Sequence, residues 1–380
     1  MGKTDAAAVV SRSGGLEETA AGSSLGRGRG WRRIWSGLVP ALVLLMLAPA
    51  VAEVAEVAEV LFGATPVSNL GALLPDVAVY GCGALLIREA VRRRGLGWAS
   101  ILALGVAFGI VEEGLALGSL FNPNLFNAGD LGGRALGVNW VWAQLTLGYH
   151  AVWSISIPIL LAELLFPARR AEPWLGWKGL VAAGYFYVLG ILAFAAMFRL
   201  VVAPGFVAPT VPFAVAVLAV VGLVALALHR RSGFVVAERH EPVGGVPSPW
   251  LIAFLALVAA SAWFVPLLDL PDSLRSGAWV LVLMLLAIAP VAVVVALIGR
   301  WSRPDRGWTD LHRLALVIGV LPARLLYGFF YVTAGSPVDR AGQAIASAAA
   351  VALLGLFARR VHGKIVSDED SVRRTAPQDS

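Results

Sequence analysis

Residues 276–298 read SGAWVLVLMLLAIAPVAVVVALI and contain no charged side chain. Crossing the hydrocarbon core of a bilayer takes about 20 helical residues at a rise of about 1.5 Å each, so this run is long enough to span a membrane. Lipid cannot satisfy exposed backbone groups, and the run is too long and too uniformly apolar for a barrel strand. It therefore predicts a transmembrane helix.

Nine further apolar runs have a comparable length. They are residues 34–52, 72–91, 99–120, 139–165, 178–198, 210–228, 249–267, 311–333 and 341–358. The composition agrees, since 58% of the 380 residues are hydrophobic and only 14% are charged. We expect an all-α, polytopic transmembrane helix bundle of about ten spans over residues 34–360. The polar segments 1–33 and 361–380 are expected to be disordered tails, the first of them basic.

The basic residues predict the orientation of this bundle. If the N-terminus is cytoplasmic, 25 of the 30 Lys and Arg residues fall on the cytoplasmic side of the alternating connections. This distribution follows the positive-inside rule and predicts a plasma-membrane protein with both termini in the cytoplasm. The net charge of +6 is thus explained by topology. We expect the lipid bilayer as the partner and no nucleic acid, whereas the sequence leaves the substrate and the oligomeric state open.

The sequence contains none of the common motifs that would indicate nucleotide binding, zinc binding or disulfide formation. The chain has no P-loop, no dinucleotide-binding fingerprint and no His-Glu-x-x-His motif. Its single cysteine, Cys82, excludes an internal disulfide and a cysteine-based metal cluster. The first apolar run also resembles a secretory signal, because Arg32 and Arg33 precede it and small residues follow, so its cleavage stays an alternative.

Three ionisable residues mark a candidate site inside the membrane. Glu112 and Glu113 lie about 18 to 20 Å from the inner end of the third run, and His150 lies about 15 Å from the outer end of the fourth. In a core about 30 Å thick these depths coincide, and the two helices are neighbours in sequence. Because ionisable side chains are costly in lipid, they are functional candidates by default.

Helical phase predicts which side chains face one another. At about 100° per residue, one polar stripe on the fourth run contains Asn139, Thr146, His150 and Ser154, which we expect to line the site. Glu112 shares its face with small residues that permit close packing, so it is expected to face His150. Glu113 projects about 100° away, toward a different neighbour. A buried Glu-His pair that only fixes the helix register is the alternative.

Arg324 lies at a similar depth in the ninth run. It is the expected counter-charge for Glu112 or Glu113, either as part of the site or as structural charge compensation. Glu163, near the inner end of the fourth run, is expected to neutralise Arg88 or Arg169. The segment 121–127 is rich in turn residues and is expected to form either a re-entrant lid over the site or a tight connection.

Several motifs carry a resemblance to known proteins. The segments GIVEEGL (109–115), FNP (121–123) and YHAVWSISIPI (149–159) are similar to a group of uncharacterised bacterial and archaeal multi-pass membrane proteins. A Glu pair followed by an intramembrane His also resembles the first two motifs of the CPBP (CAAX protease and bacteriocin-processing, Abi) intramembrane proteases.

In the CPBP family, the Glu pair and His residues of separate spans activate water against a peptide bond within the membrane. The resemblance implies that Glu112 is the general base and that His150 binds the water or a metal. The chain departs from the family pattern at two positions, where Leu117 replaces an Arg and Thr146 replaces a Phe. It also has no second intramembrane His.

Three functions therefore stay open. The first is a membrane-embedded hydrolase or protease, and the catalytic residues would be Glu112, Glu113 and His150. The second is a small-molecule or proton-coupled transporter whose midplane site includes Arg324. The third is a structural or assembly role. The sequence shows no evident cofactor; if a divalent metal binds, Glu112 and His150 are its expected ligands.

Overall fold

The computed structural model describes residues 38–53, 74–229, 245–268, 270–303, 306–332 and 337–375. These residues form helices almost throughout, and a helix or a run of consecutive helical turns occupies each of the ten predicted apolar runs. Within these described ranges, one short hairpin pairs β1 (Arg134–Ala135) with β2 (Val138–Asn139) in antiparallel register. The predicted all-α helical bundle is confirmed.

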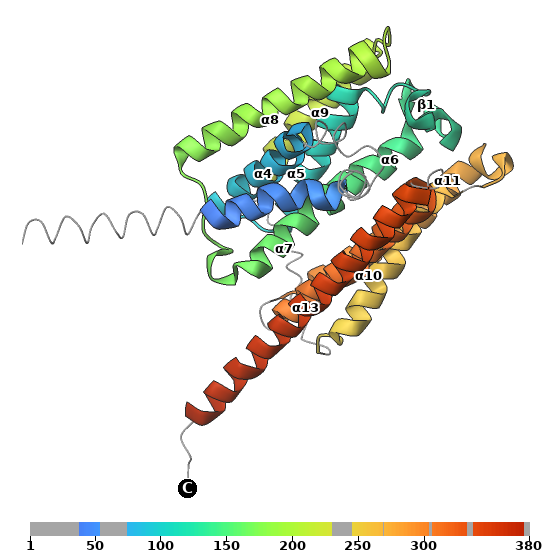
Figure 1. Ribbon diagram of the computed structural model, residues 1–380. Coiled ribbons are helices and arrows are strands. Elements are labelled where there is room, and N and C mark those ends of the chain that lie inside the picture. The colour runs from blue at the N-terminus through green and yellow to red at the C-terminus, as the bar shows by residue number, and fades with distance from the viewer. Residues whose placement is uncertain are drawn as a thin grey trace, which may run out of the picture.

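The chain forms two groups of helices, which are blue to green and yellow to red in Figure 1. The first group contains residues Leu38–Ala52, η1 (Val77–Gly81), α4 (Cys82–Arg93), α5 (Trp98–Gly109), η2 (Ile110–Leu117), α6 (Trp140–Tyr149), η4 (His150–Ser156), α7 (Ile157–Leu165), α8 (Trp177–Met197), η6 (Phe198–Val202) and α9 (Thr210–Leu228). The second contains α10 (Pro249–Trp263), η7 (Val265–Leu267), α11 (Trp279–Trp301), α12 (Asp310–Tyr327), η10 (Gly328–Val332) and α13 (Pro337–Thr375). Short 3-10 turns lie in the connections: η3 (Leu125–Leu131), η5 (Pro167–Arg169) and η8 (Asp272–Arg275).

The helices pack more extensively within each group than between the two groups. In the first group α5 packs against η4, α6 and α9, and α4 packs against α8. In the second group α10 packs against α11 and α12, and α12 packs against α13. The groups meet where α12 contacts α7 and where α11 contacts α6.

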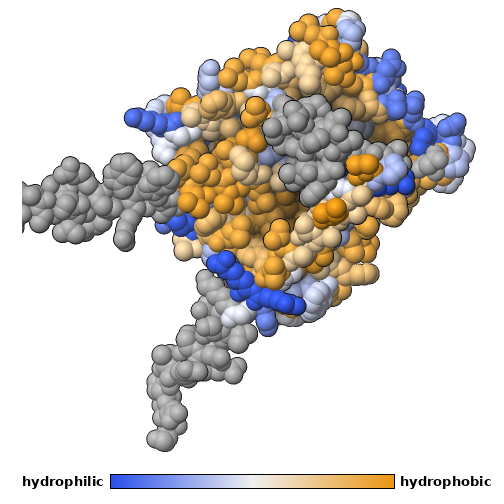
Figure 2. All heavy atoms as spheres, in the orientation of Figure 1, coloured by the Kyte–Doolittle hydropathy of each residue, from blue (hydrophilic) through white to orange (hydrophobic). Residues whose placement is uncertain are grey.

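Burial separates central helices from peripheral ones. The apolar windows of Trp98–Leu117 and Trp140–Leu165 are 72% and 78% buried, whereas that of Trp279–Trp301 is 11% buried. The face seen in Figure 2 is largely apolar, and many large hydrophobic side chains of the peripheral helices are exposed, as expected for helices surrounded by lipid. The two central helices carry the Glu pair and His150, so the candidate site lies inside the bundle.

Eight of the described helices are long and apolar enough to cross a membrane. The segment Leu38–Ala52 is a shorter apolar helix, and the second predicted run is divided between η1 and α4. The number of spans and the cytoplasmic position of both termini stay predictions.

Two boundaries differ from the sequence prediction. The predicted tail 361–380 is helical as far as Thr375, because extending α13 adds residues to an existing helix and needs no new nucleation. The third helix ends at Leu117 rather than at 120, because Gly118 has φ 76° and turns the chain out of the helix. The predicted basic tail 1–33 lies outside the described residues.

Candidate functional site

The candidate site is built on π-helical turns. Glu112 and Glu113 lie in η2, His150 and Ser154 lie in η4, and Tyr80 lies in η1. A π-helix closes its hydrogen bonds from residue i to i+5, is rare, and occurs mostly as single turns within α-helices, often at functional sites. Three such turns converge here in the buried centre of the first helix group.

The side chain of His150 is the centre of this cluster. Its Nε2 atom lies 3.2 Å from Glu113 Oε1, and its Nδ1 atom lies 3.0 Å from Ser154 Oγ and 3.5 Å from Glu112 Oε2. The four side chains are buried. The predicted proximity of Glu112 and His150, and that of Ser154 and His150, is therefore confirmed.

Glu113 also contacts His150, which corrects the prediction that it reaches only a different neighbour. That prediction applied the α-helical angle of about 100° per residue. A π-helical turn holds more residues, so consecutive side chains diverge by a smaller angle. Both glutamates of η2 can therefore approach one imidazole, one at each ring nitrogen.

Each glutamate has a second partner that the sequence did not predict. Tyr80 donates its hydroxyl proton to Glu112 Oε1 at 2.6 Å, and its ring stacks on that of His150 with centroids 6.2 Å apart. Ser119 donates to Glu113 Oε2 and in turn accepts a hydrogen bond from Trp142 Nε1 at 3.0 Å. The sequence shows Tyr80 as a polar side chain within an apolar run, which marks it as a candidate. Whether its side chain faces Glu112 depends on the π-helical turn η1.

Close packing brings the two central helices together. A Cβ atom added at Gly105 would lie 2.7 Å from Ala151 Cα, and one added at Gly109 would lie 3.2 Å from His150 Cβ. Real side chains almost never approach so closely, so glycine is required at Gly105 for α5 to contact η4. This contact sets the distance between the glutamates and the imidazole.

The remaining residues of the predicted polar stripe have different positions. Thr146 lines the cavity described below and donates its hydroxyl to the Trp142 carbonyl oxygen at 3.0 Å. Asn139 precedes α6 and donates to the carbonyl oxygens of Ser119 and Asn122, each at 3.0 Å. It is not among the cavity-lining residues and holds the connection after η2, so its predicted role in lining the site is corrected. The stripe assumed that helix continues through residue 139, where ψ is 87°.

The connection 121–127 covers part of the site. Phe121 and Asn122 are buried, and Phe126 lines the cavity with its ring stacked on Trp142 at 5.5 Å between centroids. Phe126 and Asn127 have φ values of 57° and 53°, so the chain turns sharply there. The predicted position over the polar site agrees with this arrangement, and re-entry into the membrane stays a prediction.

Arg324 does not pair with the glutamates. Its Nε donates to the Tyr149 hydroxyl at 2.7 Å, and that hydroxyl donates to the Ala52 carbonyl oxygen at 2.5 Å. Within the described part of the chain, no ion pair joins Arg324 to Glu112 or Glu113, which corrects the predicted counter-charge. Depth alone suggested the pairing, but Arg324 approaches from the second helix group and meets Tyr149 first.

A cavity of about 370 Å³ lies between the two helix groups and is lined by residues of both. Its polar lining includes Glu112, Glu113, His150, Tyr80 and Thr146 from the first group and Arg324 from the second. Two further carboxylates, Glu53 and Asp76, also line it. The other lining residues are apolar or aromatic: Pro75, Leu117, Phe126, Trp142, Leu145, Tyr149, Phe194, Met197, Phe198, Trp263, Phe264, Leu267 and Tyr327.

Comparison with known proteins adds the family. The sequence model of a family described as "Uncharacterized membrane protein family" matches residues 42–363. The chain belongs to this family. No curated protein and no solved structure matches the chain.

This membership agrees with the expected resemblance to uncharacterised multi-pass membrane proteins. The matched range includes Glu112, Glu113 and His150 and most of both helix groups. The description of the family names no protease, so the resemblance to the CPBP proteases stays a hypothesis about the site.

The described residues contain no cluster of three or more His, Cys, Asp or Glu side chains that could hold a metal ion. Both ring nitrogens of His150 already face protein oxygens, Nε2 that of Glu113 and Nδ1 those of Ser154 and Glu112. Metal binding by Glu112 and His150 therefore stays a prediction that these contacts do not require.

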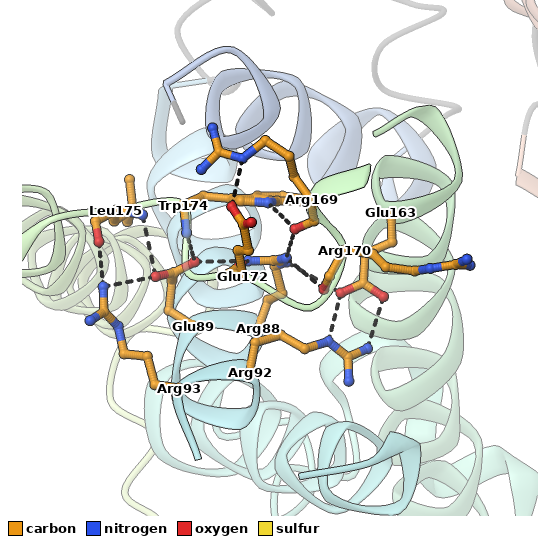
Figure 3. Close-up of polar contacts among 10 residues, drawn as sticks. All are labelled: Arg88, Glu89, Arg92, Arg93, Glu163, Arg169, Arg170, Glu172, Trp174 and Leu175. Atoms are coloured by element: carbon orange, nitrogen blue, oxygen red, sulfur yellow. Dashed lines mark hydrogen bonds and ion pairs between the residues drawn. The ribbon is translucent and has the colours of Figure 1, made fainter. Parts of the chain in front are cut away.

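Glu163 belongs to a separate charged network at the predicted cytoplasmic end. Arg92 binds both of its carboxylate oxygens, at 2.7 and 2.8 Å, and Arg88 Nε lies 3.3 Å from Oε1 (Figure 3). The predicted pairing with Arg88 is confirmed, but Arg169 pairs with Glu172 instead. The main partner, Arg92, lies one helical turn beyond Arg88 on α4 and was missed because the sequence does not determine which of the two arginines reaches Glu163 more fully.

Proposed function

We propose that this membrane protein is a membrane-embedded hydrolase in which Glu112, Glu113 and His150 activate a water molecule. The observation that carries the proposal is the placement of two buried carboxylates at opposite nitrogens of one buried imidazole, beside a cavity. Clusters of this kind are costly in a bilayer, which favours a function that needs proton transfer.

Glu112 is the better candidate for the general base. Its Oε2 atom has no hydrogen-bond partner among the described residues, while Tyr80 holds Oε1. A water molecule beside Oε2 would give its proton to Glu112 as its oxygen attacks a carbonyl carbon. The proton would then pass to the leaving group when the bond to that group breaks.

His150 and Glu113 have supporting roles in this proposal. Glu113 is held by Ser119 and contacts His150 Nε2, so it fixes the orientation of the imidazole. The imidazole would in turn orient the water or stabilise the oxyanion that forms during the attack. Neither glutamate would form a covalent intermediate.

The lining of the cavity suggests an apolar substrate with one polar bond. Aromatic and aliphatic side chains outnumber the polar ones around the cavity, and the site lies within the membrane-spanning helices. An amide or ester carbonyl within a hydrophobic peptide or a lipid-soluble molecule fits such a lining.

Reconstituted protein tests the proposal. Proteoliposomes would be assayed with internally quenched hydrophobic peptides and with 4-methylumbelliferyl palmitate as an ester probe. We expect turnover by the wild type and a loss of about 100-fold or more in Glu112→Gln, the scale of general-base catalysis. The control is Glu172→Gln, which changes an exposed glutamate. Absence of turnover in the wild type with every probe, or equal rates in wild type and Glu112→Gln, would contradict a hydrolase.

A second candidate function is a proton-coupled transporter. One observation favours it: the cavity lies between two helix groups and is lined by four carboxylates, Glu53, Asp76, Glu112 and Glu113, and by Arg324. Carriers commonly place ionisable side chains near the midplane between two bundles that move against each other. The same proteoliposomes, loaded with a pH-sensitive dye, would then show proton movement that Glu112→Gln abolishes, without hydrolysis of any probe.

A further inference from the structure

A second cavity, of about 330 Å³, lies at the predicted cytoplasmic end of the bundle. It is formed where α4 ends, α5 begins, α7 ends and α12 begins. Its lining includes three arginines, Arg92, Arg170 and Arg313, and one carboxylate, Glu163. This position is the level at which lipid headgroups meet the protein if the predicted orientation holds.

The ion pairs around this cavity leave positive charge in excess. Arg170 Nη1 and Arg313 Nη1 both bind the same oxygen, Asp310 Oδ1, at 2.6 Å each. Glu163 is likewise shared between Arg92 and Arg88. Each of these two carboxylates thus serves two guanidinium groups. Because Arg88 also pairs with Glu89, the balance at the cavity concerns its three lining arginines, Arg92, Arg170 and Arg313, which share the two carboxylates and leave positive charge in excess.

The arginines are held in place but remain accessible. The side chains of Arg170 and Arg313 are 40% and 32% exposed, and each engages Asp310 through Nη1. Arg92 is fixed by two hydrogen bonds to Glu163 (Figure 3). It also donates to the Leu96 carbonyl oxygen. Guanidinium groups bind phosphate oxygens with two parallel hydrogen bonds, so this pair of accessible forks suits a phosphate.

The rest of the lining is apolar. Leu96, Trp98, Leu160 and Leu164 line the same cavity, and the Arg92 guanidinium lies 5.4 Å from the centre of the Trp98 ring. The phosphate of a phospholipid could bind the arginines while its acyl chains pack against the leucines. A free phosphate ion has no acyl chain to pack against these apolar side chains.

We propose that this cavity binds the phosphate of an anionic phospholipid from the cytoplasmic leaflet. Basic pockets between transmembrane helices on that side are typical sites for anionic headgroups. The site also spans the two helix groups, because Arg170 follows α7 and Arg313 belongs to α12. A bound lipid would therefore stabilise the contact between the groups that enclose the larger cavity.

Thermal melting of the purified full-length protein tests this proposal. In detergent, dioleoylphosphatidylglycerol is expected to raise the melting temperature, whereas dioleoylphosphatidylcholine is not. Glycerol 3-phosphate separates a lipid site from a free phosphate site. The proposal is overturned if glycerol 3-phosphate at the same concentration gives an equal shift, or if both lipids act alike.

Two matched variants localise the effect. Arg313→Gln removes a lining charge, and Arg94→Gln removes one from an exposed arginine at the end of α4 that does not line the cavity. We expect Arg313→Gln to weaken phosphatidylglycerol binding by about tenfold, the loss of one charge-assisted hydrogen bond, and Arg94→Gln to weaken it by less than about twofold. Equal weakening in both would mean a diffuse attraction to surface charge and would overturn the site.

A labelling experiment on the wild type removes any dependence on the folding of a variant. Photoactivatable phosphatidylglycerol would be crosslinked in proteoliposomes and the attachment sites mapped by mass spectrometry. Labels within residues 92–98 and 160–171 support the proposal, and labels found only elsewhere contradict it.

Discussion

Glu113 Oε1 lies 3.2 Å from His150 Nε2, although 37 residues separate the two in the sequence. Both residues lie on π-helical turns, and Gly105 lets the helices that carry them approach each other closely. The contact therefore depends on helix packing as much as on the two residues themselves.

Gly105→Ala is expected to destabilise the bundle. The new Cβ would lie 2.7 Å from Ala151 Cα, which is backbone and cannot move independently, so the helices must separate. Overpacking of this kind costs about 1 to 3 kcal/mol and lowers the melting temperature. Gly184→Ala in α8 is the control, because its Cβ meets no atom within 4 Å. Similar melting temperatures for the two variants would show that the close contact is not needed.

Glu112→Gln and His150→Gln distinguish a functional cluster from a structural one. The amide side chains keep much of the shape and hydrogen bonding but cannot exchange protons as a carboxylate or an imidazole does. For a functional cluster we expect near-normal melting and loss of the activity measured in proteoliposomes. A lower melting temperature, with activity in proportion to the folded protein, would instead indicate a structural pair.

Arg324 is expected to couple energetically to Tyr149 and not to the glutamates. A double-mutant cycle of Arg324→Gln with Tyr149→Phe should give an interaction energy of about 1 to 2 kcal/mol, because a hydrogen bond to a charged group is lost. The cycle with Glu113→Gln should give less than about 0.5 kcal/mol, as for residues without a shared partner. Unfolding free energies in mixed micelles measure both cycles. The reverse order of the two energies would restore the ion pair with Glu113.

Arg88 is expected to be the most sensitive charge at the predicted cytoplasmic end. Its side chain is fully buried, binds Glu89 and three carbonyl oxygens, and lies 3.3 Å from the centre of the Trp174 ring (Figure 3). Arg88→Leu leaves Glu89 with one cation fewer in a buried setting, which costs about 3 to 5 kcal/mol.

Lysine should not rescue this position. It has no planar fork to reach several carbonyl oxygens at once, so Arg88→Lys is expected to melt well below the wild type. Arg94→Leu, at an exposed position on the same helix end, should change melting little. The prediction fails if Arg88→Lys melts like the wild type.

Reporter fusions test the predicted orientation. A fusion within the connection 229–249 and one at the C-terminus should both report the cytoplasm, since basic residues gather on that side. Fusion activities measured in cells with alkaline phosphatase and green fluorescent protein give the answer. A periplasmic signal at either position would remove a span from the predicted ten.

The sequence by itself determined that the protein is surrounded by lipid and that its fold is an all-α helical bundle. Lipid imposes length, polarity and backbone hydrogen bonding on each span separately, so the run at 276–298 indicates a helix without knowledge of its neighbours. Depth is also local, because rise along a helix follows from counting residues. For that reason Glu112 and His150 could be placed at a common level, and the structure brings them to 3.5 Å.

Tertiary structure alone decided which side chains meet. The partner of Arg324 depends on which helix lies opposite and on the rotation of each helix about its axis, and neither follows from residue counts. The π-helical turns changed the angle between Glu112 and Glu113 and brought Tyr80 to the site. Which arginine of α4 binds Glu163 with two hydrogen bonds, Arg92 or Arg88, was likewise set by the way α4 packs on α7. The packing of whole helices sets these contacts. The sequence alone does not determine them, because several faces of each helix have a similar polarity.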